Sequence, residues 1–299
     1  MEDSESHRIR LAAFNWLQKI AVANEYVMDW QDLSKSFIYK GQVIPLIGPK
    51  GIWKPKGIRK YPISIATVSN SPYKDKIIGN NTLSYSYRGD DPMHPDNIGL
   101  REAKRAQIPL IYLHQVIKGR YFVAWPVFVV DDNPSALKFT ISVESGEVIN
   151  DEKILSEPSA QYRREYQTRE VIVRLHQKSF REQVLKAYRE HCAICNLKHR
   201  SLLDAAHIIP DSEGGSPVVS NGLSLCKIHH AAYDQNIIGI SPDYKIEVRE
   251  DILEEIDGPM LRYGLQETHN KQLILPRSLE LRPNQEWLDV RYQRFKKIG

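Results

Sequence analysis

The chain has 299 residues, a length typical of two folded domains, and with 41% hydrophobic and 26% charged residues it is not a globally disordered chain. Its net charge of +4 is too small to indicate nucleic-acid binding by itself. There is no apolar run near 18 residues and no basic and apolar signal peptide at the start, so we expect a soluble, cytoplasmic protein without membrane segments.

The first half of the chain is expected to be rich in β-structure. Spaced apolar side chains predict a helix over 7–22, and a turn-rich stretch precedes a second expected helix over 97–106. β-branched and alternating apolar residues predict strands at 37–39, 43–46, 63–68, 83–87, 108–116 and 120–130. We therefore interpret residues 1–150 as a β-rich, barrel-like domain.

The second half has a different character. A polar stretch at 150–159 marks the predicted boundary, so we expect a linker and basic helix over 151–180 and a second domain over 181–299. Helical patterns follow at 164–190, 252–263 and 284–296. From Gln161 to Arg200 there are ten Lys and Arg residues but four acidic ones. Phosphate binding needs such a local excess, although a charge run is also typical of a solvated helix face.

The three cysteines have a spacing typical of a metal site. Cys192 and Cys195 form a C-x-x-C pair, and Cys226 and His229 form a C-x-x-H pair further along. Each tight turn lets two side chains reach one tetrahedral ion, and an odd number of cysteines does not suit a disulfide framework. The sequence therefore predicts a structural Zn²⁺ that staples a module too small to bury much core; the alternative is buried free cysteines beside a surface histidine.

A second pattern lies between and after these pairs. Residues 203–210 read Leu-Asp-Ala-Ala-His-Ile-Ile-Pro, residues 220–222 read Ser-Asn-Gly, and residues 229–234 read His-His-Ala-Ala-Tyr-Asp. With His207, Asn221 and His230 in this order, residues 180–245 resemble the HNH (ββα-metal) endonuclease family. The resemblance implies a DNA endonuclease in which His207 is the general base, Asn221 holds the loop and orients that base, and His230 binds a divalent cation.

The chemistry of phosphodiester hydrolysis accounts for these residue types. A neutral imidazole with a pKa near 6.5 can take a proton from water, and a divalent cation offsets the phosphate charge. Asp234 lies four residues after His230, on the same helix face, and is the predicted second ligand for Mg²⁺ or Mn²⁺. Many members of the family carry Asp where this chain has Ala206, and Asp204 either compensates or is solvated. Alternatively, His207 is a core histidine, His230 replaces His229 at the zinc, or Asn221 is a turn residue.

The N-terminal half invites a targeting function. Residues 83–97 and 109–113 resemble the N-terminal half of predicted restriction endonucleases that end in HNH. The arrangement also resembles modification-dependent enzymes whose PUA- or SRA-like barrel holds a flipped base. Candidate base- and DNA-binding side chains, each equally open to a structural role in a strand or turn, are Trp53, Tyr85, Tyr87, Arg88, Asp90, Asp91 and Asn97.

We therefore predict an α+β protein with a PUA/SRA-like DNA reader followed by a zinc-stapled HNH nuclease domain and a C-terminal helical extension. It would cut foreign double-stranded DNA, with modified cytosine as the expected mark, as a modification-dependent restriction enzyme in defence. A single ββα module cuts one strand, so we expect a homodimer. The alternatives are a zinc-knuckle DNA-binding protein without cleavage and an HNH nuclease triggered by a ligand that the N-terminal domain senses.

Overall fold

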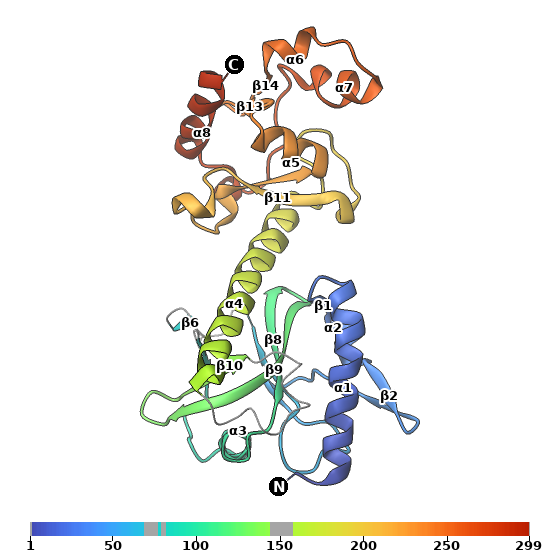
Figure 1. The fold of residues 1–299 in the computed structure, drawn as a ribbon, viewed down its shortest axis with the longest axis vertical. Helices are drawn as coiled ribbons and strands as arrows, with labels where there is room; N and C mark the ends of the chain where they lie inside the picture. Colours follow the sequence, from blue (N-terminus) through green and yellow to red (C-terminus); the bar gives the residue numbers. More distant parts are fainter. Residues whose placement is uncertain (1, 69–76, 79–81, 144–157, 299) are drawn as a thin grey trace. The chain divides into compact units, whose positions relative to one another are not determined.

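The computed structural model describes the backbone of residues 2–68, 77–78, 82–143 and 158–298, with side chains for all of these except 77–78 and 158–170. The chain divides into two compact units, Met1–Lys178 and Ser179–Gly299, and both strands and helices occur in each (Figure 1). This confirms the predicted α+β class. None of the helices in the described residues is long and apolar enough to cross a membrane. The polar stretch 150–159, which marks the predicted boundary, lies largely outside the described residues.

Unit 1 is built on one curled, half-barrel sheet of eight strands. The strand order is β4-β5-β8-β9-β10-β7-β6, with β1 paired to β9, and every pairing is antiparallel except that of β5 with β8. The strands are β1 (Val27–Asp29), β4 (Ile52–Trp53), β5 (Ser64–Thr67), β6 (Ile77–Ile78), β7 (Thr82–Ser86), β8 (Leu110–Ile117), β9 (Arg120–Asn133) and β10 (Lys138–Val143).

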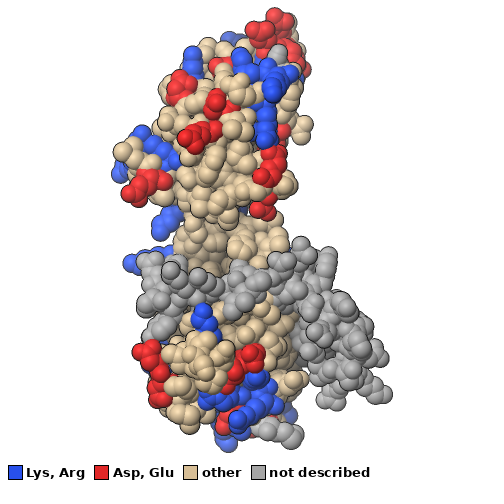
Figure 2. Space-filling view, turned by 90° about the vertical axis from the view of Figure 1, so that its left-hand side faces the viewer, with Lys and Arg blue, Asp and Glu red and all other residues tan. Residues whose placement is uncertain are grey.

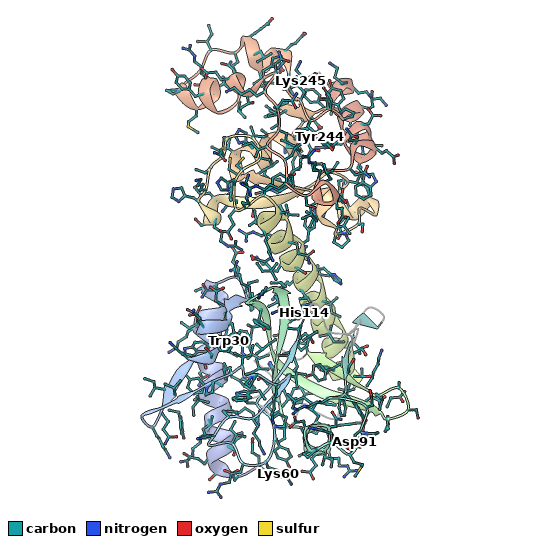
Figure 3. The ribbon with its side chains drawn as sticks, turned by 180° about the vertical axis from the view of Figure 1, so that it is seen from behind. Trp30, Lys60, Asp91, His114, Tyr244 and Lys245 are labelled. Carbon is teal, nitrogen blue, oxygen red and sulfur yellow. The ribbon has the colours of Figure 1, made fainter. Side chains whose placement is uncertain are left out.

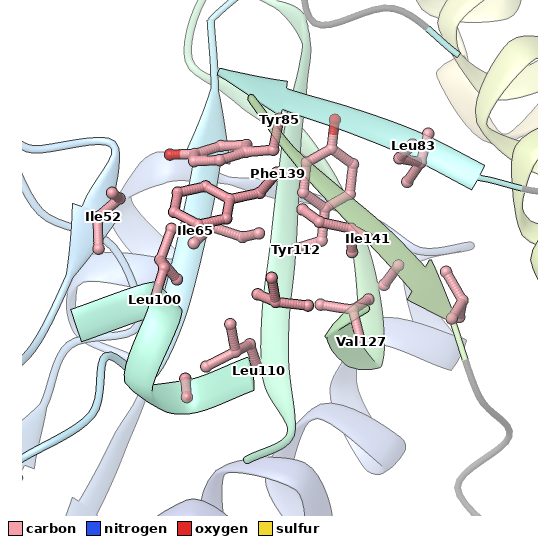
Figure 4. Close-up of a cluster of buried hydrophobic side chains, with 14 of the residues drawn as sticks. Ile52, Ile65, Leu83, Tyr85, Leu100, Leu110, Tyr112, Val127, Phe139 and Ile141 are labelled. Carbon is pink, nitrogen blue, oxygen red and sulfur yellow. The ribbon is translucent and has the colours of Figure 1, made fainter. Parts of the chain in front are cut away.

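Both faces of this sheet are buried, which explains why its central strands read as nearly continuous apolar runs. On one face, Leu113 and Val123 pack with the helix α1 (Ser4–Ala23). On the other, Leu110 and Phe122 pack with the helix α3 (Pro95–Arg105) and with Tyr85. Figure 4 shows the rings of Tyr85, Tyr112 and Phe139 among aliphatic side chains of this second core.

Further elements complete unit 1, and one helix is shared by both units. The short helix α2 (Trp30–Ser34) precedes a hairpin of β2 (Phe37–Tyr39) and β3 (Gln42–Ile44). The helix α4 (Pro158–Ala187) spans the unit boundary: its Ile172 and Leu175 belong to a core of unit 1, and its Phe180 and Val184 to the core of unit 2.

Unit 2 places a ββα motif in front of a helical extension. The elements are β11 (Leu203–His207), β12 (Gly222–Cys226), α5 (Lys227–Asp234), β13 (Ile238–Ile240), β14 (Ile246–Val248), α6 (Glu250–Glu254), α7 (Pro259–Gly264) and α8 (Gln285–Ile298), with single-turn 3₁₀ helices between some of them. The prediction of one continuous helix over 252–263 is wrong, because the two short helices α6 and α7 occupy this stretch. The backbone is extended at Glu255 and Gly258, and Pro259 opens a second helix instead.

Candidate active site

The site is built on the hairpin of β11 and β12 and on helix α5, which follows it. Antiparallel pairing places His207 opposite Gly222 and Leu203 opposite Cys226. Helix α5 starts directly after Cys226, so the end of β12 and the first turn of α5 carry both Cys226 and His229. The register thus brings the predicted zinc ligands to one end of the hairpin and His207 to the other.

The four predicted zinc ligands are gathered as one cluster. The ligand atoms of Cys192, Cys195, Cys226 and His229 all lie within 4.8 Å of one another. Sγ of Cys195 and Sγ of Cys226 are 4.0 Å apart, and Nδ1 of His229 lies 3.5 Å and 3.1 Å from the sulfurs of Cys192 and Cys226. A tetrahedral Zn²⁺ with metal–sulfur bonds of about 2.3 Å separates its sulfurs by about 3.8 Å, so the donor set fits this ion.

The surroundings of His229 favour metal binding through Nδ1. Its Nε2 donates a hydrogen bond of 2.7 Å to the carbonyl of Gly264, which fixes the ring and leaves Nδ1 directed at the sulfurs. Burial disfavours a charge on this imidazole, but the neighbouring sulfurs of Cys192 and Cys226 outweigh it and raise the pKa of His229 to about 10. The sulfurs therefore stabilise a positive charge beside them, which a bound Zn²⁺ would supply.

His207 ends β11 with one face of its ring covered. The ring of Phe180, from α4, is stacked on it with centroids 4.0 Å apart and planes 14° apart. Burial lowers the pKa of His207, with His230 adding to that effect and Asp211 and Asp234 opposing it. The imidazole is thus kept neutral near pH 7, which is the state that a general base needs.

Asn221 secures the loop between the two strands. Its buried side chain accepts a hydrogen bond from the amide of Ile209 (2.9 Å) and donates to the carbonyls of Ile209 and Ser216 (both 3.0 Å). Gly215 is required beside it, because a Cβ there would lie 1.9 Å from the carbonyl oxygen of Ile209. The expected hydrogen bond from Asn221 to the base is absent among the described residues, so the Asn221 side chain holds the loop without a hydrogen bond to His207.

His230 lies between two carboxylates. Its Nε2 is 3.3 Å from Oδ2 of Asp234, and its Nδ1 is 4.0 Å from Oδ2 of Asp204. The neighbouring carboxylate of Asp204 raises the pKa of His230, and the His230 imidazole in turn lowers the pKa of Asp204. Two ligands at right angles on a Mg²⁺ with bonds of about 2.1 Å lie about 3.0 Å apart, which suits Nε2 of His230 and Asp234. In the described chain, only the Cys₃His cluster has three or more ligand atoms within 4.8 Å of one another.

Residues 192–241 match the sequence profile of the HNH endonuclease family. This segment is an HNH endonuclease domain. It contains the ββα motif, the zinc-type cluster and the three residues His207, Asn221 and His230. The chain therefore carries a nuclease domain, as the sequence predicts.

Two solved structures align with part of the chain. One is a modification-dependent restriction endonuclease, TagI, at 15% identity over 79% of this chain and 82% of that one, with a TM-score of 0.31. The other is the type IV phosphorothioation-dependent restriction endonuclease ScoMcrA, at 16% identity over 79% of this chain and 50% of that one, with a TM-score of 0.21. This chain thus spans about half the length of ScoMcrA. No curated protein sequence matches it.

Much of the basic stretch around the HNH domain is occupied by internal ion pairs. Arg181 contacts Asp204 (3.4 Å) and donates to the carbonyl of Leu203 (2.8 Å), while Arg200 pairs with the buried Glu182. Sequence reasoning did not single out these arginines as structural. Among the described side chains, exposed cations of this stretch that form no ion pair are Lys186, Arg189 and Lys198. On the face drawn in Figure 2, cationic and anionic side chains are interspersed over unit 2.

The aromatic candidates for base binding in unit 1 are packed. Tyr85 is 5% exposed in a core, and the ring of Tyr87 lies 4.5 Å from that of Phe139. The Tyr87 hydroxyl contacts Asp132. Trp53 donates from Nε1 to the carbonyl of Pro45 (3.0 Å). These contacts give each ring a structural role, and their role in stacking on a base stays a prediction.

The polar candidates of unit 1 form a local turn. Asn97 is fully buried; it accepts from the amide of Arg88 (2.8 Å) and donates to the carbonyls of Arg88 (3.1 Å) and Asp91 (2.9 Å). The Arg88 side chain pairs with Asp96, Asp91 accepts from the amide of Met93 (2.8 Å), and Asp90 is exposed. Asn97 thus ties the turn to α3. A DNA contact by any of these residues stays a prediction.

Unit 1 also holds a buried polar chain that the sequence did not reveal. The Tyr112 hydroxyl lies 3.2 Å from that of Thr67 and 2.9 Å from Nδ1 of His114. His114 is labelled in Figure 3. Burial, with a contribution from His176, lowers the pKa of His114 to about 4, so its ring is neutral at pH 7. No sequence pattern distinguishes this chain of side chains, because Thr67 joins Tyr112 and His114 only through the parallel pairing of β5 with β8.

Proposed function

We propose that this protein is a metal-dependent DNA endonuclease that hydrolyses phosphodiester bonds with the HNH domain of unit 2. The observation that carries the proposal is the placement of a neutral histidine, His207, in the same ββα motif as a second histidine, His230, that faces Asp234. A protein that only binds DNA needs neither group in this arrangement.

Each residue has a distinct part in the reaction. His207 takes the proton from the attacking water, since its lowered pKa leaves the imidazole unprotonated near pH 7. Asn221 fixes the loop that follows His207 and keeps the end of the strand in place. His230 and Asp234 would hold Mg²⁺ or Mn²⁺, which when bound supplies positive charge opposite the scissile phosphate. The Cys₃His cluster would hold the structural zinc.

The substrate is proposed to be double-stranded DNA that carries a modified base, with modified cytosine as the expected mark, so that the enzyme would act in restriction of foreign DNA. This is supported by the sequence resemblance of residues 83–97 and 109–113 to predicted restriction endonucleases. It is also supported by the separate, β-rich unit 1, whose curled sheet is compatible with a PUA- or SRA-like reader.

Cleavage of matched DNA tests the proposal. The purified protein is incubated with Mg²⁺ or Mn²⁺ and duplexes that carry plain, methylated or hydroxymethylated cytosine. We expect cutting of a modified duplex alone. Equal cutting of all three would retain the nuclease and contradict the reader, whereas no cutting with either metal would contradict the nuclease.

A DNA-binding protein without cleavage is the second candidate. The observation in its favour is Ala206, which is fully buried at the position where many HNH enzymes carry an aspartate. If this second candidate is right, the protein binds DNA tightly and breaks no strand in any of these reactions.

A further inference from the structure

One contact of the candidate base comes from outside the hairpin that carries it. The imidazole of His207 forms no hydrogen bond with any described side chain, so Asn221 does not set its orientation. Phe180, 27 positions earlier in the chain and on α4, is stacked on the ring with centroids 4.0 Å apart and an angle of 14°. Phe180 is itself 3% exposed and belongs to the core of unit 2, so its ring has a fixed place.

The strand partner of His207 leaves room for this aromatic ring. Gly222 lies opposite His207 in the hairpin, and a Cβ at this glycine would lie 2.9 Å from Cζ of Phe180 and 2.4 Å from Cγ2 of Val184. Both distances are shorter than Cβ contacts allow. The helix α4 can therefore approach the hairpin, and Phe180 can reach His207, because residue 222 has no side chain.

We propose that Phe180 is a positioning residue of the nuclease reaction, which holds the His207 imidazole in one plane and shields one of its faces from water. The proposal rests on the proposed function. A flat stack with an immobile ring restricts rotation of the imidazole, which otherwise has a broad range of ring orientations. A base held in one orientation has its proton-accepting nitrogen in place before the substrate arrives.

Phe180→Leu tests the proposal, since leucine keeps much of the apolar volume but has no flat face. We expect kcat to fall by about tenfold to hundredfold with the KM for DNA unchanged. Water would reach the uncovered face and raise the pKa of His207 toward 6.5, so the acid limb of the rate profile would move to higher pH. Charges that face this ring, from Asp211, Asp234 and His230, are unchanged by the variant.

Val184→Ala is the matched control, because Val184 lies on the same helix, is equally buried and approaches Gly222 without a ring contact to His207. Gly222→Ala is the reciprocal test, which displaces Phe180 without altering it. Each variant is compared at a temperature where it is folded and retains its zinc. A kcat and pH profile unchanged in Phe180→Leu, or an equal loss of kcat in Val184→Ala, would overturn the proposal.

A spectroscopic measurement separates this proposal from the nuclease activity itself. In the proton NMR spectrum of the intact protein, the His207 ring signals should lie upfield because of the Phe180 ring, and the shift should disappear in Phe180→Leu. Ordinary His207 shifts in the unaltered protein would overturn the stack even if both variants unfold. Upfield shifts without any DNA cleavage would instead contradict the proposed function and leave the stack in place.

Discussion

His230 lies where a single side chain would link the proposed catalytic cation to the rest of the domain. Its Nε2 faces Asp234 at 3.3 Å, and its Nδ1 faces Asp204 at 4.0 Å. Asp204 is in turn 3.4 Å from Nε of Arg181, which offsets part of its charge. If His230 binds the proposed cation through Nε2, Asp204 is the carboxylate behind a metal-binding histidine. We therefore propose Asp234 as the ligand and Asp204 as the residue that orients the ring.

Two isosteric variants distinguish these roles. Asp204→Asn is expected to raise the Mn²⁺ concentration for half-maximal cleavage by about tenfold, as loss of an outer-shell partner does. Asp234→Asn should raise it by more, because a ligand charge is lost. A titration of the cleavage rate with Mn²⁺ measures both. The reverse order of effects would make Asp204 the ligand in place of the absent aspartate at Ala206.

At the scale of residues, the sequence predicts a role where the residue belongs to a motif with a recognisable spacing. The spacing of Cys192, Cys195, Cys226 and His229 predicts their cluster, and the structure gathers them. The role of Asn221 was predicted only in part, because its partners are backbone groups of the loop rather than the base. Phe180 could not be found from sequence, since an apolar residue on a helix carries no sign of the ring that it covers.

At the scale of elements, the Cys₃His cluster is connected to α7. The hydrogen bond from Nε2 of His229 to the carbonyl of Gly264, at 2.7 Å, joins a predicted zinc ligand to the last residue of α7. Helices α6 and α7 contain no buried residue of their own, so few apolar contacts hold them in place. Their order is therefore expected to depend on the state of the cluster.

Removal of zinc tests this dependence. Chelation, or the variant Cys226→Ser, should lower the melting temperature by roughly 10 °C or more, because metal binding contributes directly to the folding of such small modules. After loss of zinc, the rate of amide hydrogen exchange in residues 250–268 should increase as much as the rate next to the cysteines. An increase in exchange confined to the residues next to the cysteines would show that α7 is held independently of His229.

Elements with strong periodicity were the predictable ones. The helix predicted over 7–22 and the strands predicted over 37–39 and 120–130 are confirmed as α1, β2 and β9. By contrast, β13 and β14 are three residues each, and the break between α6 and α7 depends on one Gly-Pro step. Such short elements are stabilised by their tertiary neighbours, which a local pattern does not reveal.

At the scale of the whole molecule, two compact units correspond to two proposed tasks. The family of the HNH domain was predictable because its residues lie within fifty positions of sequence, 192–241. The strand order of unit 1 was not, since β5 pairs with β8 and β10 with β7 across long separations. Its function as a reader consequently depends on resemblance and remains a proposal.

Double-strand cleavage would require two copies of the chain, because each carries one ββα motif in its described residues. With a plasmid that bears the preferred modification, we expect the rate of linearisation to increase more steeply than in proportion to the protein concentration. Size-exclusion chromatography with DNA bound should show a dimer. A strictly proportional rate together with a monomer on DNA would contradict the predicted homodimer.

His207 is proposed to perform chemistry on DNA, and a comparison of the unaltered protein with His207→Ala tests this role most directly. Both proteins are given Mn²⁺ and the same modified duplex, after equal zinc content and equal melting temperatures have been established. We predict that the unaltered protein cuts, and that His207→Ala binds this duplex with similar affinity but cuts at least about a hundredfold more slowly. Equal cleavage by both proteins would show that His207 is not the general base.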